Sequence, residues 1–354
     1  MHRSPLFSTL ALAALALGAL SAADLHVLPQ ATGDASGSNW DNALAANNDD
    51  LSARFAALAP GDGILLGSGT YPAFALQLAG GGTAEAPVRL HGVDTGAGLP
   101  EIYGTWQRNN PKTGSNGFVL QAGLHHADIA NFRCRNYQRV VTGTDGGLSD
   151  LRFSGLDIES VRNGFYLVGS PSANNHHLVI EDCSIRNYTK RAVRFQNGNH
   201  TILVRNVSAD AGGQEWAVER FAIGFHVVGA YKASPEDKAN SLDHHIRFES
   251  CSSRGHYDDN GDKYWNADGF AAEGGSHNLV YVDCLAENNT DGGWDDKSTN
   301  PLLIGCSSKG NKRNYRFWSK DNRATLIDCR AEAALKTGGS GDATAIWSNG
   351  PVLF

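Results

Sequence analysis

Residues 266–297 read NADGFAAEGGSHNLVYVDCLAENNTDGGWDDK, and this stretch decides the fold that the sequence predicts. Asp-Gly-Phe stands at 268–270, and Asp-Gly-Gly-Trp-Asp follows at 291–295. Between them lie a Gly-Gly turn, an apolar run with period two and an Asn-Asn corner. Such a run between turn residues is typical of a β-strand. The stretch is therefore predicted to be one repeat of a strand-and-turn unit.

The position of Cys284, near the middle of this stretch, has equivalents at regular intervals along the chain. Most steps between the equivalent positions are 22 to 27 residues, and the two longer steps contain insertions at 208–244 and 255–265. A fixed period of this length is typical of a solenoid. The equivalent positions are Leu156, Cys183, Val207, Cys251, Cys284, Cys306 and Cys329.

A second column of equivalent positions is aromatic. Two columns in register over successive repeats predict an all-β chain folded as a right-handed parallel β-helix, and the period is too short for propeller blades. A short helix at 49–58 is predicted to cap the open end of the solenoid. The repeats are expected over roughly 60–335, and the segment 336–354 is expected to cap or fray. The aromatic positions are Phe165, Phe195, Phe225, Phe270, Trp294 and Phe317.

All six cysteines end short apolar strands, and they are predicted to share one register. Cysteines at equivalent points of successive repeats stack as small buried apolar side chains, so free thiols are expected. Disulfide pairing stays an open alternative, because an exported protein passes through an oxidising compartment.

The first residues predict export. Residues 1–23 combine a basic start, a Leu/Ala-rich run and small residues before Asp24, which is typical of a secretory signal peptide. Residues 24–354 are then expected to form one secreted, monomeric domain with no membrane anchor. A formal net charge of −7 and the lack of a basic stripe argue against a nucleic-acid partner.

Acidic residues are predicted to converge on one face of the solenoid. Neighbouring coils are about 4.8 Å apart, so Asp268, Asp291 and Asp295 are expected to lie together, with Arg316 on the next coil. Clustered carboxylates are hard oxygen ligands suited to Ca²⁺. An open alternative is that these Asp-Gly pairs only form corners.

The motifs NADGFA and NTDGGWD resemble those of the family 9 pectate lyases, which are secreted parallel β-helix enzymes. The match covers roughly residues 245–330. The resemblance implies Ca²⁺ ligands at Asp268, Asp291 and Asp295 and a catalytic base at Arg316. It also implies β-elimination on an acidic polysaccharide that contains uronate, such as pectate.

The chain departs from this family at two positions. Gly292 stands where the family has a fourth aspartate, which leaves that ligand position to water, Asp296 or the substrate. Arg316 stands where the family has lysine, and a guanidinium is harder to use as a base. Lys297 and Lys320 are therefore alternative bases and are also predicted to bind substrate carboxylates.

Aromatic side chains near the acidic cluster are predicted to stack on sugar rings. These are Trp265 and Trp318, together with Tyr264. Two other functions stay open at this stage: a non-catalytic carbohydrate-binding β-helix protein, and a glycoside hydrolase on the same fold, which needs a pair of carboxyl groups.

Three pairs of adjacent histidines begin predicted strands, at 125–126, 176–177 and 244–245. Their spacing matches no metal-binding motif, so they are interpreted as surface corner residues. The acidic run at 258–262 is interpreted as a polar loop.

Overall fold

The computed structural model describes residues 22–230, 234, 236–259, 261, 263–318 and 323–354. The predicted signal peptide, apart from its last two residues, and Lys320 lie outside the described residues. Within the described part of the chain, no helix is long and apolar enough to cross a membrane.

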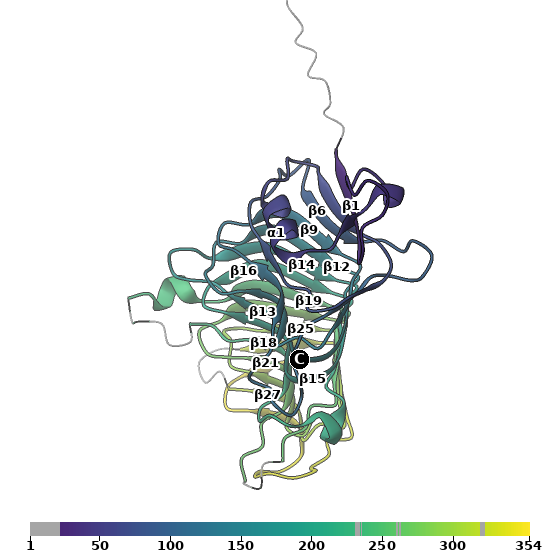
Figure 1. The fold of residues 1–354 in the computed structure, drawn as a ribbon. Helices are drawn as coiled ribbons and strands as arrows, with labels where there is room; N and C mark the ends of the chain where they lie inside the picture. The colour runs from purple at the N-terminus through teal and green to yellow at the C-terminus, as the bar shows by residue number, and fades with distance from the viewer. Residues whose placement is uncertain (1–21, 231–233, 235, 260, 262, 319–322) are drawn as a thin grey trace, which may run out of the picture.

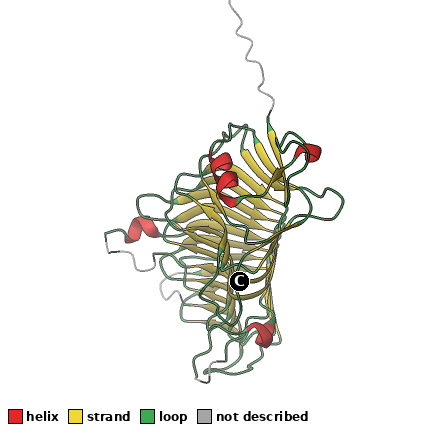
Figure 2. Cartoon of the chain, viewed as in Figure 1, coloured by secondary structure: helices red, strands yellow, loops and turns green. Residues whose placement is uncertain are grey.

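The chain winds into a stack of coils whose strands all pair in parallel, as Figure 1 and Figure 2 show. Each full coil contributes one strand to a 13-stranded sheet, here called sheet A. The rest of the coil contributes two strands to an 18-stranded sheet, which consists of two ladders, here called ladders B and C. The two ladders join at β13 (Asp157–Val168) and β15 (Ser184–Gln196), because each of these long strands belongs to both. This is the predicted right-handed parallel β-helix.

The strands follow one another in chain order along each face. Sheet A consists of β1 (Asp24–Leu28), β2 (Leu44–Ala45), β3 (Gly63–Leu66), β6 (Val88–Gly92), β9 (His125–Ala130), β12 (Ser149–Ser154), β14 (Asn175–Glu181), β16 (Asn199–Arg205), β19 (His244–Glu249), β22 (His277–Val282), β25 (Leu302–Ile304), β28 (Ala324–Ile327) and β31 (Val352–Leu353). Ladder B consists of β4 (Thr70–Tyr71), β7 (Glu101–Tyr103), β10 (Arg133–Arg135), the first parts of β13 (Asp157–Val168) and β15 (Ser184–Gln196), β17 (Ser208–Asp210), β20 (Ser252–Arg254), β23 (Leu285–Glu287), β26 (Ser307–Lys309) and β29 (Arg330–Glu332). Ladder C consists of β5 (Leu76–Leu78), β8 (Asn116–Leu120), β11 (Arg139–Gly143), the last parts of β13 and β15, β18 (Ile223–Val227), β21 (Asp268–Ala272), β24 (Gly292–Asp296), β27 (Arg313–Phe317) and β30 (Thr344–Ser348).

The predicted cysteine register is confirmed for five of the six cysteines. In these coils the residue after the cysteine position donates its amide hydrogen to the carbonyl of the equivalent position in the preceding coil. Examples are the hydrogen bonds from Leu285 to Cys251 and from Ser307 to Cys284. Cys134 is the exception, because it pairs with Ile158, two positions later in the coil. All six thiols are free, and burial raises the pKa of Cys183 to about 12.

The predicted aromatic column is wrong at two positions. Val193, rather than Phe195, pairs with Phe165 and Phe225, and Tyr315, rather than Phe317, pairs with Trp294. Residues two apart in a strand face the same side, so either one satisfies the pattern in the sequence. The true column stacks closely, with ring centroids 4.7 Å apart between Phe270 and Trp294 and 5.1 Å apart between Trp294 and Tyr315.

The predicted capping helix is present as α1 (Asn48–Ala56), and the Asn47 side chain caps its N-terminus by accepting the Asp50 amide hydrogen. Leu51 and Phe55 are buried in the core. Side-chain oxygens of the helix accept amide hydrogens from the first strand of ladder C and the residue before it, as from Gln77 to Ser52. The helix therefore covers a strand edge that would otherwise be open. The other helices in the described residues are single turns, η1 (Trp40–Asn42), η2 (Gly213–Trp216) and η3 (Lys238–Ser241).

Both ends of the repeat region extend beyond the predicted limits. Strands β1 and β2 continue sheet A before the helix, and β30 and β31 form a further coil in the segment expected to cap or fray. The hydrophobic core therefore runs from Val27 to the last coil, where Ile346 and Val352 pack against it.

Candidate active site

The predicted site residues come together on ladder C. Asp268 begins β21, Asp291 directly precedes β24, and Asp295 lies within β24. Arg316, on β27, pairs in register with Asp295. Its guanidinium lies between two carboxylates, with Nη1 3.1 Å from Asp291 Oδ2 and Nε 3.7 Å from Asp295 Oδ1.

Asp268 is the most deeply buried acid of the cluster, with none of its surface exposed. The Gly292 amide donates a hydrogen bond of 2.6 Å to Oδ1, while Oδ2 has no hydrogen-bond partner among the residues that the structure describes. Burial, Asp295 and Asp291 raise the pKa of Asp268 well above its ordinary value. The carboxyl group therefore favours its protonated form at neutral pH.

Asp291 is held by three cationic side chains, all from the next coil. Arg313 Nη1 lies 2.6 Å from Oδ1, Lys312 Nζ lies 3.1 Å from the same oxygen, and Arg316 binds Oδ2. The Lys312 side chain is 1% exposed, so its charge is removed from solvent beside this carboxylate. A buried ion pair of this kind is costly to break from one side, which fixes the geometry.

Asp295 connects the cluster to a second acid. Lys297 Nζ lies 3.3 Å from Asp295 Oδ2 and 3.0 Å from Glu273 Oε2. Burial alone would lower the pKa of Lys297, but Asp295 and Glu273 outweigh it and raise that pKa. Burial would raise the pKa of Glu273, but His226 and Lys297 lower it to about 2. Lys297 is therefore a cation and Glu273 an anion at neutral pH.

The side chains of this cluster do not fit Ca²⁺ as they stand. Among the described residues, the three aspartates do not gather oxygens within 4.8 Å of one another. Asp291 and Asp295 are already bound by cations, and the four acids here face four cations: Lys297, Lys312, Arg313 and Arg316. Because a divalent ion needs several unengaged oxygens, it would have to displace these cations.

Gly292 and Asp296 do not supply the missing ligand. A Cβ atom at position 292 would lie 2.8 Å from Asp268 Oδ1, so the backbone amide occupies the place of a side chain. Asp296 is in register with Phe317 and is 1% exposed. Its oxygens accept hydrogen bonds from Tyr281 Oη at 3.0 Å and from the Ser298 amide at 2.7 Å.

The predicted aromatic residues lie at the edge of the cluster. Trp318 Nε1 donates a 2.5 Å hydrogen bond to Asp295, and the Arg316 guanidinium lies 4.2 Å from the centre of the Trp318 ring. Trp347, which the sequence did not single out, packs 4.6 Å from Trp318. Trp265 lies against the Gly338–Gly339 backbone, and Tyr264 is 59% exposed.

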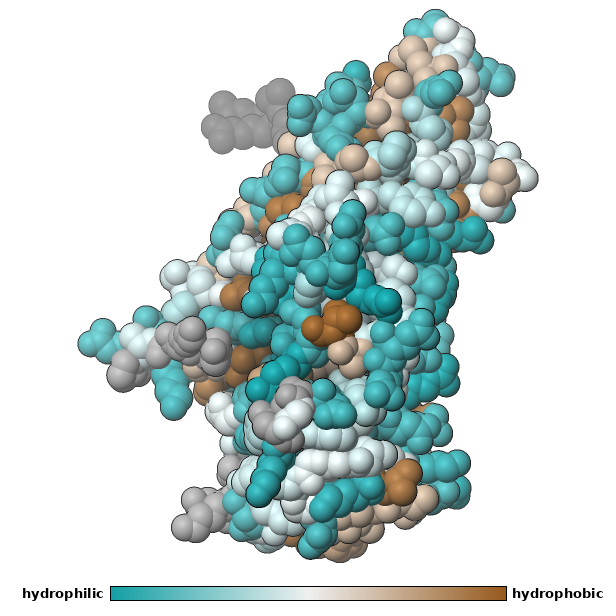
Figure 3. All heavy atoms as spheres, turned by 60° about the horizontal axis from the view of Figure 1, so that its bottom comes forward, coloured by the Kyte–Doolittle hydropathy of each residue, from teal (hydrophilic) through white to brown (hydrophobic). Residues whose placement is uncertain are grey.

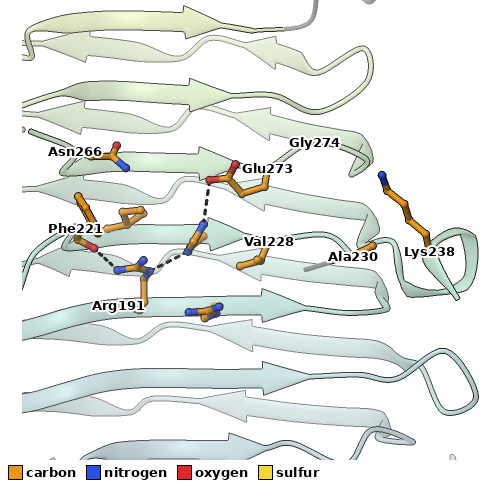
Figure 4. A pocket seen from close by; sticks show the side chains of 11 residues that line it. Arg191, Phe221, Val228, Ala230, Lys238, Asn266, Glu273 and Gly274 are labelled. Carbon is orange, nitrogen blue, oxygen red and sulfur yellow. Dashed lines mark hydrogen bonds and ion pairs between the residues drawn. The ribbon is translucent and has the colours of Figure 1, made fainter. Parts of the chain in front are cut away.

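A cavity of about 560 Å³ lies on the coils of β15, β18 and β21. Figure 4 shows the side chains that line it. Glu273 lines this cavity and connects it to Lys297. Arg191 Nε donates a hydrogen bond of 2.9 Å to His226 Nδ1, and His226 Nε2 lies 3.8 Å from Glu273. Arg194 also lines the cavity, and within the described part of the chain its buried Nε has no hydrogen-bond partner.

No motif in the sequence predicts this cavity. Its side chains come from three coils, and the 208–244 insertion separates Arg191 from Glu273 along the chain. The register would place these strands side by side, but no local motif marks them. The face of the molecule shown in Figure 3 is mostly hydrophilic, with small separate groups of hydrophobic side chains.

Comparison with known proteins supports the fold. No family model matches this chain, and no curated protein sequence matches it. Among solved structures, pectate lyase Pel9A is similar over 94% of this chain and 81% of that chain, with a TM-score of 0.62 and 14% identity. This chain has the pectate lyase-like parallel β-helix fold. XylC in complex with xylose is similar over 81% of this chain and 69% of that chain, with a TM-score of 0.51 and 10% identity.

Proposed function

We propose that this protein is a secreted, monomeric polysaccharide lyase that cleaves a uronate-containing polymer by β-elimination. The observation that carries the proposal is the Arg316 guanidinium held between Asp291 and Asp295. The fold likeness to pectate lyase Pel9A and the NADGF and DGGWD motifs support it.

The exposure of the side chains suggests how roles are divided. The carboxylates of Asp268, Asp291 and Asp295 are buried, whereas the Arg316 and Lys297 side chains are 16% and 30% exposed. A sugar carboxylate would therefore meet the Lys297 cation, which Asp295 and Glu273 hold in place. Such pairing stabilises the charge that develops when the C5 proton leaves, and charge stabilisation is a large term in catalysis.

In the proposed reaction, Arg316 takes the C5 proton. The electron pair of that bond forms the C4–C5 double bond, the C4–O4 bond breaks, and O4 takes a proton from solvent. A guanidinium has no acceptor site, so Arg316 acts as the base only after it has lost a proton to solvent, and it returns the C5 proton to solvent after the reaction. Asp291 Oδ2, 3.1 Å from Nη1, holds the Arg316 side chain in place.

No step of this mechanism uses Ca²⁺, because the donor set does not fit the ion. The resemblance implies a calcium requirement, whereas the side chains of the cluster predict none, and a chelator distinguishes the two. We expect lyase activity to persist in excess EDTA, since Lys297 already offers positive charge to the substrate. Loss of activity in EDTA and recovery with added Ca²⁺ would show that the aspartates rearrange around the ion.

The test is an assay of the ultraviolet absorbance of unsaturated uronates on pectate, alginate and glycosaminoglycans. Arg316→Ala should lower kcat by about 100-fold or more, as expected for loss of a general base. Arg316→Lys should retain part of the activity, because an amine can accept the proton once it is neutral. Lys309→Ala is a matched control, since this exposed cation lies on ladder B of the same repeat. Absence of unsaturated products on every polymer would refute the proposal.

One observation favours a second function, glycoside hydrolysis. The carboxylates of Glu273 and Asp295 both contact Lys297 Nζ, so their nearest oxygens are at most about 6 Å apart, a limit that includes the separation typical of retaining enzymes. New reducing ends without unsaturated products would identify this activity. Binding of polyuronate without any turnover would instead identify a carbohydrate-binding protein.

A further inference from the structure

Histidines form an ordered array on sheet A, the sheet that does not carry the candidate active site. His176, His200, His244 and His277 occupy one position in four successive coils. Their rings stack with centroids 5.3, 4.9 and 4.9 Å apart. The parallel register therefore gathers residues that lie far apart in the sequence.

A second column runs beside the first because the backbone is left-handed at the next residue of each coil. Asp150, His177 and His245 have φ angles of 55°, 54° and 52°. This conformation interrupts the alternation of the strand, so adjacent side chains lie together on the surface. His176 Nδ1 consequently lies 2.9 Å from His177 Nδ1.

A carboxylate completes the group at one point of the array. Asp150 occupies the position of His177 on the preceding coil, and its Oδ1 lies 3.7 Å from His177 Nδ1. One ligand atom from each of Asp150, His176 and His177 lies within 4.8 Å of the others. The Asp150 and His177 side chains are 36% and 55% exposed, so an ion can reach them from solvent.

We propose that Asp150, His176 and His177 bind one divalent transition-metal ion of the zinc class. Two imidazole nitrogens and one carboxylate oxygen form a donor set that suits Zn²⁺, Ni²⁺ or Cu²⁺ and does not suit the all-oxygen preference of Ca²⁺. Three protein ligands leave a coordination position for water. The bound ion connects β12 to β14 and so joins two neighbouring coils.

Stacking of like residues explains the first column but does not explain the carboxylate. His, Asp and Asn all tolerate the left-handed conformation, so the backbone alone would accept any of them at 150 and 177. The combination of Asp150 with His177 places an anion beside an imidazole pair. At His245 the corresponding neighbours are Thr201 and Asn278, which supply no carboxylate.

The experiment is calorimetric titration of the tag-free full chain with ZnCl₂ in a non-coordinating buffer. We expect saturable binding of one ion, and weakening by about tenfold or more in Asp150→Asn and in His177→Asn, the size of effect that changes in metal coordination spheres produce. Asparagine is chosen because it tolerates the left-handed backbone while removing the ligand atom. Zn²⁺ should also raise the melting temperature of the wild-type chain and not that of the two variants, because an ion that binds only the folded state stabilises it.

His245→Asn is the matched control, since it removes an imidazole from an equivalent pair, with His244 Nδ1 2.6 Å from His245 Nδ1. The control should bind Zn²⁺ within twofold of the wild-type chain. Absence of saturable binding, equal binding by Asp150→Asn and His177→Asn, or equal weakening by His245→Asn would each overturn the proposal. Because the site is remote from Arg316, these outcomes do not depend on lyase activity.

Discussion

At the scale of single residues, Gly292 determines how the acidic cluster is arranged. Its amide binds Asp268 Oδ1 at 2.6 Å, and a Cβ there would lie 2.8 Å from that oxygen and 3.0 Å from the Trp294 carbonyl. The position therefore holds a backbone donor where the resembling family has an acid. A buried acid that receives one such hydrogen bond and no cation favours its neutral form.

Gly292→Asp tests whether restoring the family pattern restores a calcium site. We expect the variant to unfold at lower denaturant concentration, with a loss of about 1–3 kcal/mol, because the added side chain overpacks the cluster. Added CaCl₂ should leave its melting temperature unchanged. Gly292→Ala controls for the steric part of the effect. A Ca²⁺-dependent rise in the melting temperature of Gly292→Asp would contradict our account of the cluster.

Asp296 should make stability depend on pH. Burial, and Asp295 to a smaller extent, raise its pKa to about 6 against hydrogen bonds that lower it. Because an unfolded aspartate titrates near 3.9, the folded state binds more protons between about pH 4 and 6. The contribution of Asp296 is therefore complete below pH 4 and is lost as the pH rises through 6, by up to about 3 kcal/mol.

Asp296→Asn isolates this effect. The amide keeps an acceptor for Ser298 and offers a donor to the Tyr281 oxygen, so the packing is preserved. We expect the variant to be more stable than the wild-type chain at pH 7.5 and similar at pH 4, as measured by urea unfolding at both values. A residual slope from Asp243, whose pKa is also raised to about 6 by burial, should remain in both proteins. Equal stability of the two proteins at pH 7.5 would argue against the raised pKa.

At the scale of elements, the sequence predicts which strands stack but not which residue of each strand lies in a given column. The cysteine register was predicted correctly because a turn fixes the position of each cysteine in its coil. The residue before the cysteine is in a left-handed turn conformation, as at Asp283 and Asp328. The aromatic column failed at Phe195 and Phe317 because a strand offers two equivalent inward positions. The two-residue difference between the predicted and the observed pairing of β24 with β27 matters for function, because the observed pairing places Arg316 in register with Asp295.

The candidate site was predictable to the extent that its residues lie in local motifs. Asp268, Asp291 and Asp295 stand in two such motifs, whereas Lys312 and Arg313, which bind Asp291, belong to none. The histidine array escaped prediction for the same reason, because its ligands are one repeat apart and only the register joins them. Ion pairing depends on side-chain directions that the repeat pattern does not specify.

Helix α1 should act as a true end cap. Phe55→Ala should destabilise the chain by about 3–5 kcal/mol through loss of a fully buried ring. It should also increase aggregation on heating, because the edge of β5 becomes accessible. Arg54→Ala is the control, since Arg54 only pairs with Asp50 on the solvent side of the same helix and should cost less than about 1 kcal/mol. Melting temperature and light scattering measure both effects, and equal loss in the two variants would contradict the capping role.

At the scale of the whole molecule, one row of positions along ladder C has an arginine at each end, Arg194 and Arg316, although the net charge of the chain is −7. Arg194, His226, Ala271, Asp295 and Arg316 occupy one position in five successive strands of this ladder. Each coil adds about 4.8 Å, so Arg194 and Arg316 are far enough apart for one polymer chain to meet both. An acidic polymer would thus be attracted locally by an otherwise acidic protein.

Arg194→Gln should therefore raise KM for a long polyuronate severalfold, while kcat and the KM for a short oligosaccharide stay the same. The reason is that the guanidinium lines the cavity next to the cluster, and its buried Nε has no partner among the described residues. The KM of the wild-type protein should also rise with ionic strength, because salt screens such attraction. Arg186→Gln makes the same change of charge on ladder B, where Arg186 pairs with Asp157 and Glu159. If Arg186→Gln raised KM as much as Arg194→Gln, the effect would come from net charge alone, and the polymer would not run along ladder C.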